Sequence, residues 1–279
     1  MKKERVDVLL VKQGLFETRE QAKRGVMAGL VCNEKNERFD KPGVKVPEDT
    51  IFHLKGNQKQ YASRGGLKLE KALNDFAVDV KDKVVLDIGA STGGFTDVML
   101  QSGAKLSYAL DVGYNQLAWR LRQDPRVVVM ERQNFRYSKL EDFTEGQPEF
   151  ASIDVSFISL KLILPVLATI IQKGGDVVAL IKPQFEAGKE NVGKNGIVRD
   201  PQIHEQVLED ILSFAVQEGF NVEELSFSPI KGGEGNIEFL VHLNYVGKED
   251  AQISSSIPSI HELVAQAHTQ LKKEKKASE

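Results

Sequence analysis

The chain has little of the chemistry that marks secreted or membrane proteins. Its 279 residues include a single cysteine, Cys32, so no disulfide can form within the chain and a reducing compartment is expected. The N-terminus lacks the apolar stretch of a secretory signal. The longest uncharged apolar run, residues 162–171, has ten residues, against the ~20 that a membrane-spanning helix needs. We therefore expect a cytoplasmic protein that does not cross a membrane.

A large excess of one charge is also missing. The chain has 37 Lys/Arg and 40 Asp/Glu, and 41% of its residues are hydrophobic, which is ordinary for a folded globular protein and excludes a disordered chain or a collagen-like repeat. The charges are unevenly distributed, because residues 1–60 carry 13 basic and 9 acidic residues whereas the remaining 219 carry 24 and 31. A basic N-terminal segment on an acidic body indicates a module that binds a polyanion.

Metal-binding patterns are absent as well. The five histidines are scattered and show no ligand spacing, so we expect no metal site; they are His53, His204, His242, His261 and His268.

The first 60 residues predict a small α+β domain. Apolar residues at helical spacing predict a helix over 5–13, and Thr18 with Gln21 forms a capping box that opens a second helix. Three short β-type runs follow, at 30–32, 44–46 and 51–54. The helices carry five basic residues that are candidates for RNA binding, although a solvated basic face is the simpler alternative: Arg5, Lys12, Arg19, Lys23 and Arg24.

From residue 84 the pattern changes to short apolar runs that alternate with helical stretches. This alternation predicts an α/β fold with a doubly wound, mostly parallel sheet. Seven strands are expected at 84–88, 106–110, 127–130, 150–155, 177–181, 222–227 and 237–243. Helices are expected at 94–101, 115–122, 160–171 and 203–218. The last two strands leave no room for a helix between them and should form an antiparallel pair. The interdomain linker is expected at 61–65, the catalytic domain at 66–247, and a tail with an amphipathic helix at 248–279.

A glycine-rich turn follows the first strand of this sheet. Its spacing is neither Gly-x-Gly-x-x-Gly nor a P-loop, so nucleotide-phosphate binding loses support. Asp87, before the turn, suits a ligand with a cationic group, Asp111 ends the next strand where an acid can bind ribose hydroxyls, and the amide of Asn134 can read an adenine edge. These features predict S-adenosylmethionine as cofactor, although Asp111 can also be a loop carboxylate or a helix cap. The turn itself supplies six candidate cofactor-binding residues: Gly89, Ala90, Ser91, Thr92, Gly93 and Gly94.

Four ionisable residues stand where a catalytic site is expected. Asp154 and Lys182 end consecutive predicted strands, so they should meet at the ligand-binding edge of the sheet. Glu238 starts the last predicted strand, and Lys68 lies on the helix that enters the domain.

In this order, Lys68, Asp154, Lys182 and Glu238 resemble the Lys-Asp-Lys-Glu tetrad of ribose 2′-O-methyltransferases of the FtsJ superfamily. Four segments resemble the TlyA (haemolysin A) family within it, namely 87–96, 111–119, 154–160 and 182–186. The N-terminal segment resembles the alpha-L RNA-binding fold of a small-subunit ribosomal protein, through Arg5, Asp7, Gly14, Leu15, Thr18, Arg19, Ala22, Gly29, Val31 and Asn33.

This resemblance implies a Rossmann-like, seven-stranded methyltransferase domain whose last strand is antiparallel. It implies S-adenosylmethionine-dependent 2′-O-methylation of cytidine in ribosomal RNA of the small or large subunit. Lys182 is expected to act on the 2′-oxygen, with Asp154 and Glu238 orienting it and Lys68 completing the pocket. Further RNA contacts are expected from Arg64, Phe185 and Lys189, although Phe185 can equally seal the cofactor pocket.

Three alternatives remain open: a non-catalytic RNA-binding or ribosome-assembly protein, a membrane-active haemolysin, and a methyltransferase that acts on small molecules or protein. The intact tetrad disfavours the first, the lack of a spanning segment the second, and the basic N-terminal segment the third. The sequence leaves open which nucleotide is modified and whether the protein is a monomer or a weak dimer.

Overall fold

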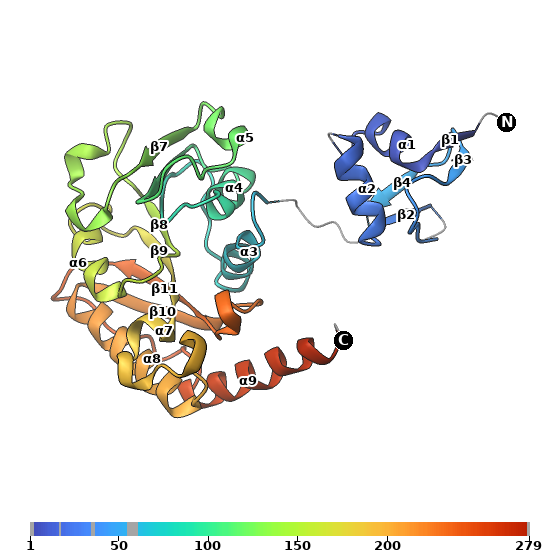
Figure 1. Cartoon of the computed structure of the whole chain (residues 1–279). Coiled ribbons are helices and arrows are strands. Elements are labelled where there is room, and N and C mark those ends of the chain that lie inside the picture. Colours follow the sequence, from blue (N-terminus) through green and yellow to red (C-terminus); the bar gives the residue numbers. More distant parts are fainter. Residues whose placement is uncertain (1–2, 17, 35–36, 55–60, 278–279) are drawn as a thin grey trace. The chain divides into compact units, whose positions relative to one another are not determined.

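The structure is a computed structural model of the full chain, and its description covers residues 3–16, 18–34, 37–54 and 61–277 (Figure 1). The chain divides into two compact units, residues 1–60 and 61–279. Each unit is described by itself.

The N-terminal unit consists of two short helices and two pairs of short strands. Strands β1 and β3 pair antiparallel, as do β2 and β4. The expected capping box is present, since Thr18 Oγ1 accepts from Gln21 N at 3.3 Å and Gln21 Oε1 accepts from Thr18 N at 3.2 Å. The elements are β1 (Lys3–Arg5), α1 (Val6–Lys12), α2 (Arg19–Met27), β2 (Val31–Asn33), β3 (Lys45–Pro47) and β4 (Phe52–Leu54). The core between them contains Val6, Leu9, Leu10, Ala22, Val26, Val31 and Phe52.

The C-terminal unit is built on a seven-stranded sheet in the order β10-β11-β9-β8-β5-β6-β7. Strands β5 to β9 run parallel, whereas β11 is antiparallel to both β9 and β10. The expected α/β fold with an antiparallel last strand is therefore confirmed. The strands are β5 (Val84–Ile88), β6 (Leu106–Asp111), β7 (Val127–Glu131), β8 (Phe150–Ile153), β9 (Asp176–Ile181), β10 (Phe220–Phe227) and β11 (Phe239–Tyr245).

Two of the expected helices are shorter than the sequence predicts. The helix expected over 115–122 is reduced to its last turn because Asn115 has a left-handed φ of 56° and Ala118 an extended ψ of 136°, so the helix begins only at Trp119. The stretch 160–171 splits into a 3₁₀ turn and one α-helical turn that begins with Leu164 and Pro165, since proline favours the first turn of a helix. The α-helices are α3 (Gly66–Asp75), α4 (Gly94–Gln101), α5 (Trp119–Arg122), α6 (Leu164–Leu167), α7 (Pro183–Glu186), α8 (Pro201–Gln217) and α9 (Ile260–Ala277). The 3₁₀ helices are η1 (Phe135–Tyr137), η2 (Leu140–Asp142), η3 (Leu160–Leu162), η4 (Lys189–Asn191), η5 (Lys194–Gly196) and η6 (Gly233–Gly235).

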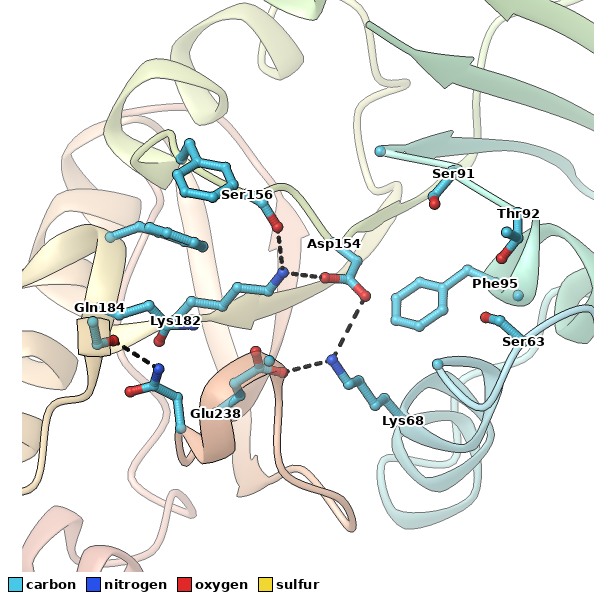
Figure 2. A pocket seen from close by; sticks show the side chains of 18 of the residues that line it. Ser63, Lys68, Ser91, Thr92, Phe95, Asp154, Ser156, Lys182, Gln184 and Glu238 are labelled. Carbon is cyan, nitrogen blue, oxygen red and sulfur yellow. Dashed lines mark hydrogen bonds and ion pairs between the residues drawn. The ribbon is translucent and has the colours of Figure 1, made fainter. Parts of the chain in front are cut away.

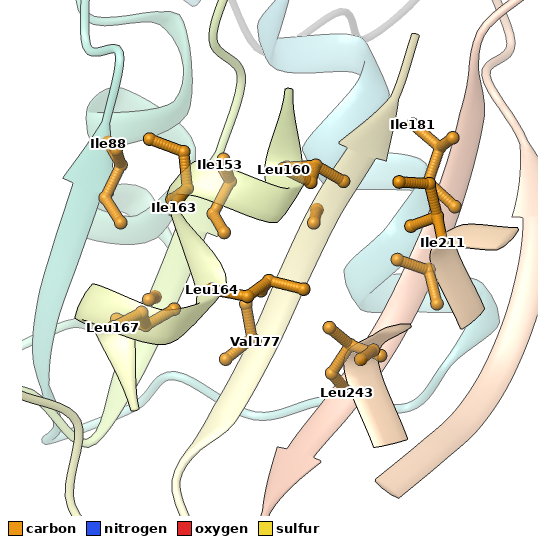
Figure 3. Close-up of a cluster of buried hydrophobic side chains, with 14 of the residues drawn as sticks. Ile88, Ile153, Leu160, Ile163, Leu164, Leu167, Val177, Ile181, Ile211 and Leu243 are labelled. Carbon is orange, nitrogen blue, oxygen red and sulfur yellow. The ribbon is translucent and has the colours of Figure 1, made fainter. Parts of the chain in front are cut away.

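Apolar side chains cover both faces of the sheet, as the near-continuous hydrophobic runs of its strands require. On β9, Val177 and Ile181 join the cluster shown in Figure 3, whereas Val178 and Leu180 join the cluster on the opposite face. This alternation is the two-residue period of a strand. Because both faces are covered, polar ligands have access to the sheet at its edges.

The residues after the last strand pack onto this unit. Val222 of β10 exchanges backbone hydrogen bonds with Gln252 and Ser254 at 2.9 and 2.8 Å. Helix α9 lies against α8 and buries four apolar side chains in the main core, as the predicted apolar stripe requires: Leu263, Val264, Ala267 and Leu271. The side chains of the lysine-rich end, residues 272–276, lie outside the described residues.

Candidate active site

A cavity of about 740 Å³ opens at the edge of the sheet where β5, β8 and β9 end and β11 begins (Figure 2). Its walls come from α3 and the segment before it, the glycine-rich turn, the loop after β8, α7, and the loops around η5 and η6. The lining residues are Ser63, Gly65, Lys68, Gly89, Ala90, Ser91, Thr92, Gly94, Phe95, Asp154, Ser156, Phe157, Lys182, Gln184, Phe185, Val192, Asn195, Gly196, Gly233, Asn236 and Glu238.

The structure brings the four residues of the expected tetrad together in this cavity. Lys182 Nζ lies 2.5 Å from Asp154 Oδ1 and 3.3 Å from Ser156 Oγ. Lys68 Nζ lies 2.6 Å from Glu238 Oε2 and 3.7 Å from Asp154 Oδ2. Both lysines and Glu238 are buried. Two ammonium groups and two carboxylates compensate one another, which makes it possible to hold four charges in such a site.

The register of the sheet explains why these residues meet. Asp154 directly follows β8, and Lys182 directly follows β9. Strand β11 runs antiparallel to β9 and pairs Phe239 with Ile181. Glu238, the residue before β11, therefore lies beside the end of β9. Glu238 is expected from the sequence to orient Lys182, but it accepts its hydrogen bond from Lys68 instead.

The glycine-rich turn forms the opposite wall of the cavity. Gly89 has a φ of 88°, and a Cβ atom at this position would lie 2.5 Å from the backbone oxygen of Asp154. A Cβ atom at Gly94 would lie 2.3 Å from Ser63 Oγ. Only glycine permits these approaches without displacement. Ala90, Ser91 and Thr92 line the cavity between the two glycines.

Two residues expected to touch the cofactor face away from the cavity. Asp87 is fully buried, and its carboxylate accepts hydrogen bonds from Thr96 N at 2.8 Å, Thr96 Oγ1 at 2.7 Å and Ser152 Oγ at 3.1 Å. Burial raises the pKa of Asp87 to about 7. Gly93 packs toward Leu117 and Leu121 of the neighbouring segment. Neither Asp87 nor Gly93 lines the cavity, and both support the turn from behind.

Asp111 and Asn134 lie next to the cavity rather than in its wall. Asp111 Oδ2 accepts from Ser91 N at 2.8 Å and Oδ1 from Gly113 N at 2.6 Å, so this carboxylate joins the glycine-rich turn to the loop after β6. Asn134 lines a second hollow of about 590 Å³ together with Val112 and Arg136. This hollow shares three lining residues with the main cavity, so the two are adjacent: Ser156, Phe157 and Phe185.

Two aromatic residues, Phe157 and Phe185, line both hollows. The rings of Phe157 and Phe185 lie 5.0 Å apart, and Lys182 Nζ lies 5.9 Å from the Phe185 ring. Phe157 is 91% exposed and has a φ of 62°. The geometry thus leaves both expected roles of Phe185 available. Arg64 and Lys189 are exposed and do not line the main cavity.

The basic residues of the N-terminal unit are arranged around a buried acid. Asp7 accepts from Arg5 Nε at 2.9 Å and from Arg19 Nη2 at 3.1 Å, and the two guanidinium groups lower its pKa. Three further basic candidates lie on the helices. Lys12 pairs with Glu4 at 3.4 Å, Lys23 pairs with Glu20 at 2.5 Å, and Arg24 is exposed.

Several lining residues could not be recognised from the sequence. Ser63, Ser156 and Asn236 stand close in sequence to Lys68, Asp154 and Glu238, and this proximity is the only signal for them. Asn236 Oδ1 accepts from Val198 N at 3.1 Å and its Nδ2 donates to the Gly196 oxygen at 2.9 Å, which joins two loops over the cavity.

Glu186 accepts from Ser159 Oγ and Leu160 N, and burial raises its pKa.

Two negative findings bear on the class of protein. Within the described part of the chain, no group of three or more histidine, cysteine or acidic side chains is placed to hold a metal ion. Among the helices formed by the described residues, none combines the length and apolar character needed to cross a membrane.

The fold and the cavity define a methyltransferase of the FtsJ-like type. The FtsJ-like methyltransferase family matches residues 61–245, and the chain belongs to this family, as its motifs predict.

The chain is also similar to several named proteins. The chain is 62% identical over 276 residues to YqxC of Bacillus subtilis, whose name describes an rRNA methyltransferase, with 98% of this chain and 97% of YqxC covered. It is 41% identical over 245 residues to the 16S/23S rRNA (cytidine-2′-O)-methyltransferase TlyA of Mycobacterium tuberculosis, with 86% and 89% covered. A solved structure from Streptococcus thermophilus, of a protein called a hemolysin, shares 64% identity with a TM-score of 0.76 and covers 99% of both chains.

Proposed function

We propose that this protein transfers a methyl group from S-adenosylmethionine to the 2′-oxygen of a cytidine ribose in ribosomal RNA. The observation that carries the proposal is the neutral cluster of Lys68, Asp154, Lys182 and Glu238 beside the glycine-rich turn. The names of YqxC and TlyA support the choice of ribosomal RNA.

The residues around the cavity fit this cofactor. The glycine spacing of the turn matches neither a dinucleotide-binding turn nor a P-loop, which disfavours a nucleotide phosphate. Asp111 lies beside the turn and can bind ribose hydroxyls, and Asn134 and Val112 line the adjoining hollow where an adenine fits. When bound, S-adenosylmethionine would supply a methyl group on a positively charged sulfur.

Lys182 is the residue that acts on the acceptor oxygen. Asp154 holds its Nζ at 2.5 Å, so the amine is fixed in direction and can donate a hydrogen bond to the 2′-oxygen as negative charge develops there. The hydroxyl proton passes to Lys182 as Lys182 gives one of its own protons to Asp154 Oδ1. Lys68, held by Glu238, positions Asp154 from the other side. Most of the rate enhancement then comes from orientation of the two reactants.

Ribosomal RNA is the partner that the charge distribution supports. The exposed guanidinium of Arg24 and the lysines of α1 and α2 suit phosphate contacts. We place this reaction in the cytoplasm, where ribosomal subunits are assembled.

The test is transfer of a tritiated methyl group from S-adenosylmethionine to purified 30S and 50S subunits, followed by mapping of the label. We expect label on the 2′-oxygen of a cytidine in one or both subunits. Label on a base, or none on either subunit while the protein binds the cofactor, would overturn the proposal.

A further inference from the structure

Two arginine–tyrosine pairs lie on the surface where β6 and β7 end. The Arg132 guanidinium carbon lies 4.0 Å from the centre of the Tyr114 ring, and that of Arg136 lies 5.4 Å from the centre of the Tyr137 ring. Tyr114 is 64% exposed and Tyr137 is 71% exposed. These four residues are called the β6–β7 rim below.

The loops that carry the rim are fixed to one another. Arg132 N donates to the Gly113 oxygen at 2.9 Å, which joins the start of the β7 loop to the β6 loop beside Tyr114. Asn134 Oδ1 accepts from Arg136 N at 3.1 Å and caps η1, which contains Tyr137. These bonds fix the backbone from which the side chains of the rim project.

The two arginines of the rim differ from other arginines of the same unit in their partners. Other arginines of the same unit pair with carboxylates: Arg120 with Asp97, Arg122 with Glu131, and Arg126 with Asp124. Among the described residues, by contrast, neither Arg132 nor Arg136 forms an ion pair. A contact between a guanidinium carbon and a ring uses none of the N–H groups of the arginine, so these remain available to a phosphate.

The rim lies next to the candidate active site. Arg136 lines the second hollow, which shares Phe157 and Phe185 with the main cavity. Tyr137 lines a further hollow of about 380 Å³ that shares Asn134 with the second one. One carboxylate, Asp142, also lines this last hollow, and its Oδ2 accepts from Lys139 N at 2.8 Å.

We infer that the β6–β7 rim binds the single-stranded RNA next to the methylated nucleotide. The two guanidinium groups contact phosphates, and the exposed rings with their stacked arginines offer faces for neighbouring bases. The inference rests on the proposed function, since it concerns the same RNA. It adds an RNA-binding surface on the catalytic unit itself, apart from the basic helices of the N-terminal unit.

The test compares the wild-type protein with the double variant Arg132→Gln/Arg136→Gln. Equilibrium binding to ribosomal subunits is measured over a range of salt concentrations, together with the affinity for S-adenosylmethionine. We expect RNA affinity to fall roughly tenfold and the salt slope to decrease by about 1 to 2, because two phosphate contacts are lost. Because Arg136 lines the second hollow, the cofactor control is the single variant Arg132→Gln, whose residue lines none of the three hollows and whose cofactor affinity should stay within about twofold of wild type.

Arg126→Gln is the matched control, because Arg126 is also exposed but stands before β7, at the opposite end of that strand. It should bind RNA with the wild-type salt slope. A second variant, Tyr114→Leu/Tyr137→Leu, keeps both charges and should weaken binding with little change in slope.

Unchanged RNA affinity in both double variants would overturn the inference. Weaker cofactor binding with unchanged RNA affinity would show instead that the rim belongs to the cofactor site. RNA binding is measured directly and does not depend on methyl transfer. A rim that does not bind RNA is therefore distinguishable from a wrong proposed function, because in the second case the wild-type protein itself leaves the ribose unmethylated.

Discussion

Asp87 shows, at the scale of a single residue, how a carboxyl group can serve the site without touching it. Its three hydrogen bonds hold the first turn of α4 against β8, directly behind the glycine-rich turn. Those bonds favour the charged form, but full burial outweighs them and raises the pKa to about 7.

This shift has a defined consequence for stability. The ordinary pKa of the group is 3.8, so the folded protein binds this proton more tightly than the unfolded chain does. The contribution of Asp87 to the free energy of unfolding is therefore fully present below pH ~4 and is lost as the pH rises through ~7. Compared with Asp87→Asn, which does not titrate, wild type should lose up to about 4 kcal/mol between pH 4 and pH 8.

Urea unfolding of the two proteins at several pH values within this range measures the difference. A difference between wild type and Asp87→Asn that stays constant with pH would contradict the protonation behaviour described here.

The outcome for Asp87 also shows which site residues a sequence can reveal. Asp154 and Lys182 were predictable because the ends of neighbouring parallel strands must share one edge of a sheet. Asp87 lies at the same edge but faces the interior, and alternation along a buried strand does not reveal this when both faces are covered. The partner of Glu238 was not predictable either, because its bond to Lys68 depends on how α3 lies against the sheet.

At the scale of elements, the turn between β5 and α4 combines a backbone constraint with a close contact. Gly89 needs glycine for its positive φ and for its approach to the backbone of Asp154. Gly174 offers a comparison, because its φ is 82° but no atom lies within 4 Å of the position of a Cβ.

We expect Gly89→Ala to weaken both cofactor binding and methyl transfer by at least about tenfold, since the new Cβ must displace the backbone that carries Asp154. Gly174→Ala carries a similar backbone strain of about 1 to 2 kcal/mol and should keep normal activity. Titration calorimetry with S-adenosylmethionine, together with a thermal unfolding curve for each variant, separates the contact from the strain. Equal losses in the two variants would show that backbone strain alone is responsible.

The helices and strands differ in how well the sequence predicts them. The seven strands of the sheet were predictable from their apolar runs, and α8 from its long amphipathic pattern. The helices expected at 115–122 and 160–171 were overestimated, because a left-handed Asn115 and the proline at 165 impose local backbone geometry that periodicity does not register.

At the scale of the whole molecule, we propose RNA contacts on both units, whereas the chemistry belongs to the C-terminal unit alone. Lys23 and Arg24 of α2 carry charge without holding the buried Asp7, unlike Arg5 and Arg19. Their neutralisation therefore tests charge and removes only the exposed ion pair of Lys23 with Glu20.

The double variant Lys23→Ala/Arg24→Ala should bind ribosomal subunits several-fold more weakly, with a smaller salt slope, because phosphate contacts are lost. Its affinity for S-adenosylmethionine should not change, since the cavity lies entirely within the C-terminal unit. Lys173→Ala, which removes an exposed lysine of the other unit, is the control. Wild-type affinity and salt slope in the double variant would remove these residues from the RNA-binding surface.

The central claim is that Lys182, held by Asp154, acts on the acceptor oxygen. Single-turnover transfer of the methyl group from S-adenosylmethionine to ribosomal subunits by wild type, Lys182→Ala and Lys173→Ala tests it most directly, with cofactor affinity measured for each protein. We predict that Lys182→Ala reacts at least about 100-fold more slowly while it binds the cofactor within a few-fold of wild type, and that Lys173→Ala reacts normally. A near-normal rate for Lys182→Ala would contradict the account.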